Sequence, residues 1–306
     1  MQYDKQPLSI EEQVRRLKNR GMTCENEERF KHYLAHIGYY RLSAYWLPFE
    51  HPSEDSSARN HVFLPETSFE NVLRLYIFDR KLRLFVMDAI ERIEVAVRTQ
   101  WANAMSLKYG AHSHMDPGLF KDPWQHARDL GKITADLEDS KEAFIVHYRK
   151  KYSQPFLPPI WAVVETMSLG TLSRWIKNTK DNEVKKEIMN GLRLPTIEVL
   201  ESILHGFTPV RNVCAHHGRL WNRRFPIVLP RIKRFDSRMV PIDAPNHQAR
   251  LMFNFLVVME HLKNAINPTG QWRQDLVKHL DSMQTQELNA MGFPKNWKAM
   301  QPWNAQ

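Results

Sequence analysis

The sequence is poor in cysteine and glycine. Its 306 residues contain two cysteines, Cys24 and Cys214, and neither lies in the C-x-x-C spacing of a metal or redox site. We therefore expect a protein without disulfide bonds, as is typical of the cytoplasm. The 11 glycines form no glycine-rich loop, which excludes that kind of phosphate-binding site.

Long apolar runs are also absent. The most apolar segment, "LMFNFLVVMEHLKNAI", is interrupted by Glu260, His261 and Lys263, and it is too short and too polar to span a bilayer. It predicts a buried helix. The first 16 residues contain no apolar stretch of the kind found in secretory signals. These absences predict a cytoplasmic protein with no membrane partner.

What the sequence has in excess is positive charge. Lys and Arg number 43 against 34 Asp and Glu, which gives a net charge of +9 and a pI near 9.5. This balance favours a polyanionic partner, with nucleic acid ahead of a membrane surface. Charge alone fits equally well a basic protein that binds no specific anion.

Helix signals are dense and alternating β patterns are almost absent. Ser9 and Glu12 form a capping box, and a long helical stretch begins near Ser68 and runs to about residue 110. The proline-containing stretch 48–66 is a candidate boundary. We therefore predict an all-α fold, with an N-terminal helical extension over 1–66 and a helical bundle over 67–306.

One short segment, "RNVCAHHGRLWNRR" at 211–224, concentrates groups that act on phosphates. Thr208 and Pro209 read as the N-cap and first residue of a new helix, which would place Arg211 in its first turn. Free N–H groups and the positive end of the helix dipole bind anions there. Asn212 and His216 are four residues apart and share a helix face.

This set of side chains suits RNA cleavage. An imidazole can remove the proton of a ribose 2′-hydroxyl near neutral pH, and a guanidinium can bind the charged phosphorane. The pattern alone is weak, because the chain also contains Arg29 with His36 and Arg273 with His279. A capped helix with His216 in the core fits it as well.

The surrounding sequence resembles a known family. "RNVCAHH" is similar to the R-[polar]-x4-H motif of HEPN-domain ribonucleases, and more closely to abortive-infection (Abi) proteins of the AbiD/AbiF type. Three further blocks resemble that family in order and spacing: "HIGYYRLSAYWLPF" at 36–49, "DRKLRLFVMDAIERIEVAVRT" at 79–99 and "LPPIWAVVETMSLGTLSRWI" at 157–176. The resemblance implies a HEPN-like helical fold, a role in phage defence or a toxin–antitoxin system, and RNA cleavage without a metal or other cofactor.

The resemblance also assigns roles to residues. Arg211 matches the motif arginine, Asn212 the polar residue and His216 the histidine, and His217 lies within the allowed spacing. HEPN nucleases usually pair two motifs in one cleft, so the single motif here implies a homodimer with a composite site. An RNA or protein antitoxin is an expected partner. The alternative function is a silent HEPN-like module that binds and sequesters a specific RNA or mediates dimerisation.

Secondary candidates surround the motif. Basic residues that follow it are expected to contact RNA phosphates: Arg219, Arg223, Arg224, Arg231, Lys233 and Arg234. Trp221, Phe225 and Phe235 between them either stack on bases or anchor the segment in the core, and the core is the expected place for Trp221. Glu91 or Glu94 could orient Arg211 or His216, although an exposed Glu94–Arg98 ion pair is the usual arrangement at this spacing.

Two other clusters have simpler explanations. The aromatic residues of 39–46 are expected to pack the N-terminal helices rather than to bind RNA. Cys214, His216 and His217 lack a second nearby cysteine, so we predict no metal site there.

Overall fold

The computed structural model describes residues 6–52 and 60–304, and the fold is all-α. In these residues only isolated β-bridges occur, and no sheet forms: Thr23–Ser68, Glu50–Phe63 and Phe120–Thr179. The prediction of an all-α fold is confirmed.

The chain divides into two compact units, residues 1–81 and 82–306. The boundary lies inside the longest helix, α4 (Phe69–Tyr109), and not at residue 66 as the loop composition suggested. The reason is that the first turns of α4 belong to the N-terminal core. Phe69 stacks on Phe30 with ring centroids 4.1 Å apart, and the Tyr45 hydroxyl donates a 2.6 Å hydrogen bond to Asp79.

In its described residues, 6–52 and 60–81, the N-terminal unit contains three α-helices and one 3₁₀ helix besides the start of α4. They are α1 (Ile10–Asn19), α2 (Glu27–Ile37), α3 (Tyr39–Trp46) and η1 (Leu47–Phe49). Ser9 and Glu12 form the predicted capping box on α1. Tyr45 and Trp46 are buried as packing residues, whereas Tyr40 is 91% exposed.

The second unit contains the remaining helices. They are α5 (Pro123–Glu138), α6 (Ala143–Lys151), α7 (Ile160–Val163), α8 (Leu169–Asn178), α9 (Asn182–Gly191), α10 (Ile197–Ala215), α11 (Met252–Ile266), α12 (Trp272–Leu280), α13 (Thr285–Asn289) and the 3₁₀ helices η2 (Ser113–Met115), η3 (Pro117–Leu119), η4 (Val164–Thr166), η5 (Lys233–Phe235), η6 (Pro245–Arg250) and η7 (Trp297–Ala299).

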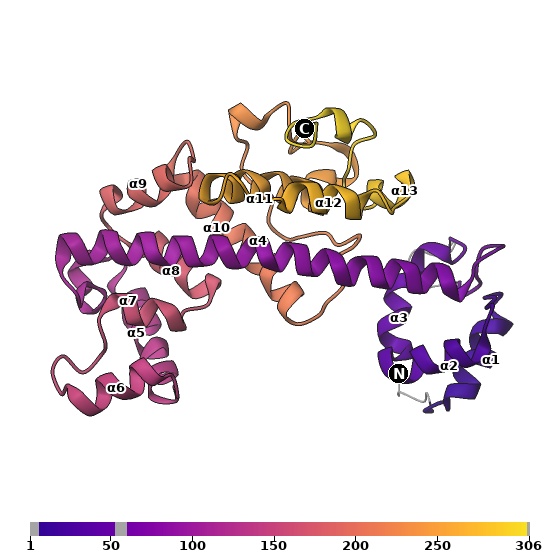
Figure 1. The fold of residues 1–306 in the computed structure, drawn as a ribbon, viewed down its shortest axis with the longest axis horizontal. Coiled ribbons are helices and arrows are strands. Elements are labelled where there is room, and N and C mark those ends of the chain that lie inside the picture. The colour runs from indigo at the N-terminus through magenta and orange to yellow at the C-terminus, as the bar shows by residue number, and fades with distance from the viewer. Residues whose placement is uncertain (1–5, 53–59, 305–306) are drawn as a thin grey trace. The chain divides into compact units, whose positions relative to one another are not determined.

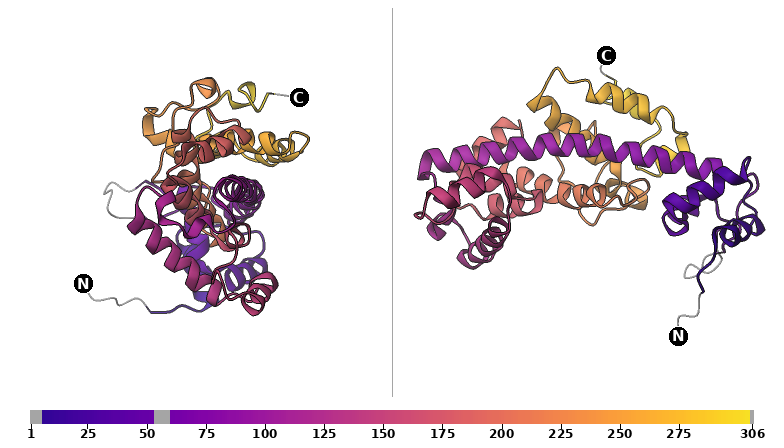
Figure 2. Two further views of the ribbon diagram at one scale, coloured as in Figure 1. Left: turned by 90° about the vertical axis from the view of Figure 1, so that its left-hand side faces the viewer. Right: turned by 60° about the horizontal axis from the view of Figure 1, so that its bottom comes forward.

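Helix α4 supplies one wall of the core of this unit (Figure 1). Its fully buried side chains recur every three or four residues, which is the spacing of one helix face: Leu82, Val86, Ile90, Ile93, Val97 and Trp101. Helix α4 is unbroken from Phe69 to Tyr109 and can be followed along its length in the right-hand view of Figure 2. Helix α10 packs against α8 and α9.

Candidate functional site

The segment 211–217 lies at the C-terminal end of α10, and the predicted helix N-terminus is wrong. Helix α10 runs from Ile197 to Ala215 with Pro209 inside it. The Thr208 hydroxyl donates a 3.0 Å hydrogen bond to the Leu204 carbonyl, one turn back, as in a helix interior, and so does not act as an N-cap. An anion here would therefore meet helix carbonyl groups, and side chains would have to bind it.

The helix ends in a Schellman motif that contains a histidine in a strained position. The Gly218 N–H donates a 2.8 Å hydrogen bond to the Val213 carbonyl, and the His217 N–H donates a 3.1 Å bond to the Cys214 carbonyl. His217 has φ 56°, the left-handed conformation that glycine usually occupies in this motif. Strained residues of this kind are concentrated at functional sites.

The motif side chains differ in burial. The Arg211 side chain is 31% exposed, whereas Asn212, His216 and His217 are exposed. His216 is the C-cap of α10, and its N–H donates a 3.0 Å hydrogen bond to the Asn212 carbonyl. The structure therefore does not place His216 in the core, and the side chains of Asn212 and His216 are accessible to a ligand.

Glu94 on α4 is the carboxylate next to Arg211. Its Oε2 lies 3.9 Å from Arg211 Nε, and the Glu94 side chain is 8% exposed. Glu94 also pairs with Arg98 one turn further along α4, and Arg98 donates a second hydrogen bond to the Met167 carbonyl. The sequence predicted an exposed Glu94–Arg98 ion pair, but the pair is mostly buried.

Burial raises the pKa of Glu94, and the nearby guanidinium groups of Arg98 and Arg211 oppose that rise. The carboxylate therefore lies between two positive charges: Arg98 donates a hydrogen bond to it, whereas Arg211 Nε faces it at 3.9 Å without a hydrogen bond. This geometry suits a residue that positions Arg211.

Glu91 lies one turn before Glu94 and is exposed. It lines an open groove with neighbours on α4 and with Ile266 at the end of α11. Among the described residues, no hydrogen bond or ion pair links Glu91 to Arg211 or His216, so of the two glutamates the structure brings Glu94 to the motif.

Arg83 is a residue of this region that the sequence did not single out. Arg83 is on α4 and is 5% exposed. Its guanidinium donates a 3.2 Å hydrogen bond to the Gly218 carbonyl. It therefore ties α4 to the turn that follows His217. No sequence signal distinguishes Arg83 from the other arginines of α4, because its role depends on a contact between segments 135 residues apart.

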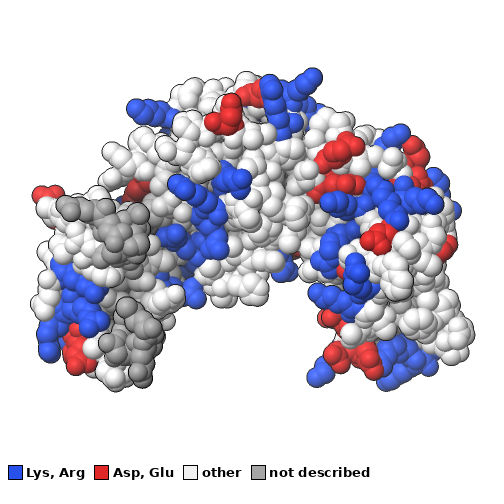
Figure 3. Space-filling view, turned by 180° about the vertical axis from the view of Figure 1, so that it is seen from behind, with Lys and Arg blue, Asp and Glu red and all other residues white. Residues whose placement is uncertain are grey.

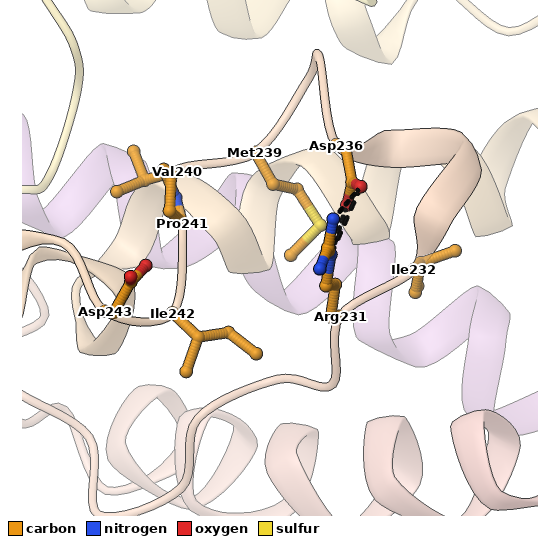
Figure 4. Close-up of a pocket in the computed structure, with 8 residues that line it drawn as sticks. All are labelled: Arg231, Ile232, Asp236, Met239, Val240, Pro241, Ile242 and Asp243. Atoms are coloured by element: carbon orange, nitrogen blue, oxygen red, sulfur yellow. Dashed lines mark hydrogen bonds and ion pairs between the residues drawn. The ribbon is translucent and has the colours of Figure 1, made fainter.

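The basic residues after the motif differ in exposure and in whether they interact with other protein groups. Arg223, Arg224 and Lys233 are exposed, while Arg219 is half-buried. Arg231 forms an ion pair with Asp236, with a shortest distance of 2.6 Å, and this pair forms part of the lining of a pocket with Met239 and Ile242 (Figure 4).

Arg234 Cζ lies over the Phe235 ring, 5.2 Å from its centroid. Arg234 Nη2 lies 3.1 Å from His261 Nε2. Burial lowers the pKa of the Arg234 guanidinium, with Arg238 nearby adding to the effect. Arg231 and Arg234 therefore have protein partners already, and Arg223 donates a 3.2 Å hydrogen bond to the Arg219 carbonyl. Arg224 and Lys233 are the stronger candidates for phosphate contacts.

The aromatic residues of the same stretch are anchored in the core. Trp221, Phe225 and Phe235 are each at most 2% exposed, and the Trp221 indole N–H donates a 3.0 Å hydrogen bond to the Glu287 carbonyl. The interpretation of these rings as base-stacking groups is wrong, because the segment needs their burial to hold its irregular backbone against α11 and α13. Trp221 occupies the core as expected.

Acidic and basic side chains are mixed on the surface. Figure 3 shows several groups of Lys and Arg, with Asp and Glu between them, on one face. Within 6–52 and 60–304, no group of three or more His, Cys, Asp or Glu is arranged to hold a metal ion, and both cysteines are free thiols. Nor does any helix in the described part of the chain combine the length and apolar character needed to cross a membrane.

The fold and the site together define an all-α protein with an arginine, an asparagine and two histidines gathered at one helix end. The family model for Abi-like protein matches residues 32–222, and the chain belongs to this family. Membership associates the protein with abortive infection, a form of phage defence. No curated protein and no solved structure matches the chain.

Proposed function

We propose that the protein is a metal-independent endoribonuclease of the HEPN type that acts in abortive infection, as a phage-defence effector or toxin in the cytoplasm. The observation that supports this most directly is the Glu94–Arg211 contact beside three exposed polar side chains. A half-buried guanidinium with a buried carboxylate 3.9 Å from its Nε can bind phosphate through its other N–H groups, and Asn212 and His216 are exposed on the same helix end.

The reaction needs one base, one acid and charge stabilisation. His216 takes the proton of the 2′-hydroxyl, and the 2′-oxygen attacks the adjacent phosphorus. The bond from phosphorus to the 5′-oxygen breaks, and that oxygen receives a proton. Arg211 binds the phosphate oxygens as charge accumulates, and Asn212 orients the phosphate or the imidazole. The products are a 2′,3′-cyclic phosphate and a 5′-hydroxyl.

A homodimer would complete this site. One chain supplies one Arg–His motif, and two copies facing each other provide a second imidazole for the acid step. His217 is the other group of the same chain that could serve in this step. The restraining partner of such a toxin would be an antitoxin RNA or an antitoxin protein.

The test is cleavage of labelled RNA in EDTA. We expect wild type to cut and R211A and H216A to lose about a hundredfold or more in rate, the typical worth of acid–base catalysis. H205A is the matched control, because His205 is an exposed histidine on the same helix but outside the motif. End-group analysis should find cyclic phosphate and 5′-hydroxyl.

Two results would contradict the proposal. Equal cleavage by wild type, R211A and H216A would show a contaminating nuclease. Tight binding of one RNA without cleavage, with or without divalent metal, would instead support the silent RNA-binding module.

A further inference from the structure

Helix α6 and the loop after it form a surface that the proposed cleavage site does not use. Helix α6 lies on the far side of α5 and α7 from α4 (Figure 1). Ile145 is its only fully buried residue, and every residue from Arg149 to Phe156 is exposed. A nine-residue helix that buries so little of itself leaves most of its side chains available to a partner.

Aromatic rings are the main feature of this surface. Phe144, Tyr152 and Phe156 are 41%, 47% and 57% exposed. Phe144, Tyr148 and Tyr152 are spaced four residues apart, so their backbone positions advance by about 6 Å along the helix from one to the next. Tyr148 and Tyr152 lie with ring centroids 5.0 Å apart. Phe144 and Tyr152 are exposed and Tyr148 is half-buried between them, so the exposed faces of the outer two rings are available for stacking by flat ligands.

Two residues of α6 fix this arrangement from within. The Tyr148 hydroxyl donates a 2.8 Å hydrogen bond to the Pro155 carbonyl and lies 3.3 Å from His112 Nε2. Arg149 donates a 2.8 Å hydrogen bond to the Glu138 carbonyl at the end of α5. The loop backbone at Pro155 is therefore tied back to α6, and α6 to α5, which limits the positions that the loop can take.

Positive charge accompanies the rings. Segment 141–156 contains four Lys or Arg and one acidic residue, Glu142. Lys150 and Lys151 are exposed, and Lys151 Nζ lies 5.3 Å from the centroid of the Tyr152 ring. At the lower right of Figure 3, Lys and Arg groups lie on the surface together with Asp and Glu groups.

We propose that Phe144, Lys150, Lys151, Tyr152 and Phe156, together the α6 surface, bind single-stranded RNA. Bases stack on the three exposed rings and phosphates pair with the two lysines, the combination by which proteins hold single strands without reading their sequence. This inference rests on the proposed function only in taking RNA as the ligand. It adds a second contact region, outside the Arg211 site, that holds the substrate.

A membrane surface fits the α6 surface less well. Interfacial helices present a continuous apolar face to the lipid. Here Ile145 points into the protein, and the exposed rings are separated by polar residues such as His147, Ser153 and Gln154. Single-stranded RNA, in which bases alternate with phosphates along the strand, fits exposed rings that are separated by polar groups and lysines.

The experiment measures binding of a labelled oligouridine by the H216A protein at several salt concentrations, so that cleavage does not interfere. We expect Y152A/F156A to weaken binding by about tenfold or more per ring, with an unchanged dependence on salt, because stacking does not release counterions. We expect K150A/K151A to lower the slope of log affinity against log salt by about 1.4. Y40A, which removes an exposed ring from α3, should bind like the parent protein.

The outcomes separate this inference from the ribonuclease proposal. If Y152A/F156A binds oligouridine as tightly as the parent, the α6 surface is not an RNA site, whether or not wild type cleaves. If vesicles containing phosphatidylserine bind the protein through these residues and oligouridine does not, the surface is a membrane contact and the inference is wrong. If the substitutions weaken binding while wild type never cleaves, this inference holds and the ribonuclease proposal fails. Because all four substituted residues are exposed, the thermal unfolding midpoint should remain unchanged.

Discussion

Arg211 on α10 and Glu94 on α4 meet with 3.9 Å between Nε and Oε2. The two residues are 117 positions apart in the sequence, yet this pair joins the motif helix to the helix that forms one wall of the core. Arg98 shares the same carboxylate, so Glu94 serves two guanidinium groups at once.

Replacing Glu94 by Gln should therefore harm both stability and activity. The amide keeps the shape but removes the negative charge, and it leaves Arg98, whose side chain is 16% exposed, with only the more distant Glu165 carboxylate at 3.8 Å as an ion-pair partner. Breaking a buried pair in this way costs about 3 kcal/mol in the free energy of unfolding. In the folded protein, loss of the orienting group should slow RNA cleavage by about ten- to a hundredfold. Urea denaturation and cleavage rates measure the two effects.

The control for E94Q is E91Q. Glu91 is exposed and lies one turn earlier on the same helix, so its substitution should change the unfolding free energy by less than about 0.5 kcal/mol. Similar losses of unfolding free energy and activity in E94Q and E91Q would show that α4 tolerates neither substitution. They would contradict a specific role for the Glu94–Arg211 contact.

The helical character could be predicted from the sequence, but the place of the segment 211–217 at the end of a helix could not. The Thr208–Pro209 pair suggested a new helix, because proline is favoured in a first turn. The stronger signal was the apolar stripe, which passes through Pro209 without a break: Ile203, Phe207, Val210 and Cys214 are all buried. Burial of that stripe outweighs one lost backbone hydrogen bond.

Gly206 lies within α10, where a Cβ atom would come within 2.8 Å of Leu229 Cδ2. Its role is to allow close packing by the segment 226–230. Contacts of this kind, like those of Arg83 and of Glu94 with Arg211, depend on the tertiary structure, and periodicity along one segment does not reveal them.

His217 provides a test of backbone strain at the helix end. H217G and H217A both remove the imidazole and its contacts. The difference between their unfolding free energies therefore reports the cost of the left-handed backbone conformation. Because φ is 56° at this position, H217G should be more stable than H217A by about 1 kcal/mol. Thermal or urea unfolding measures the difference. Equal stabilities would indicate that the turn rearranges when the histidine is lost.

His114 makes the folded state sensitive to acid. It is fully buried, neither ring nitrogen has a hydrogen-bond partner among the described residues, and burial, with His112 and His126 nearby, lowers its pKa from 6.5 to about 4. Between these two values the unfolded chain binds a proton that the folded protein does not. Stability is therefore complete above pH 6.5 and falls as the pH drops toward 4, by about 3 kcal/mol.

The measurement is the unfolding free energy across that pH range for wild type and H114M. The thioether fills the space without titrating, so H114M should lose less stability on acidification. A smaller slope will remain, because burial also lowers the pKa of His261 to about 4. Identical pH profiles for the two proteins would contradict the assignment to His114.

Pro209 should limit the stability of α10, since it has no N–H to donate to the His205 carbonyl. P209A restores that bond. An interior proline costs a helix about 3 kcal/mol, while the more flexible unfolded chain of the alanine variant returns up to about 1 kcal/mol, so P209A should stabilise the protein by about 2 kcal/mol. P230A is the matched control, because Pro230 lies outside helices and its loss should destabilise slightly. Urea denaturation measures the change in unfolding free energy, which should be positive for P209A and negative for P230A. A destabilised P209A would mean that packing of the proline ring stabilises α10 by more than the missing hydrogen bond costs.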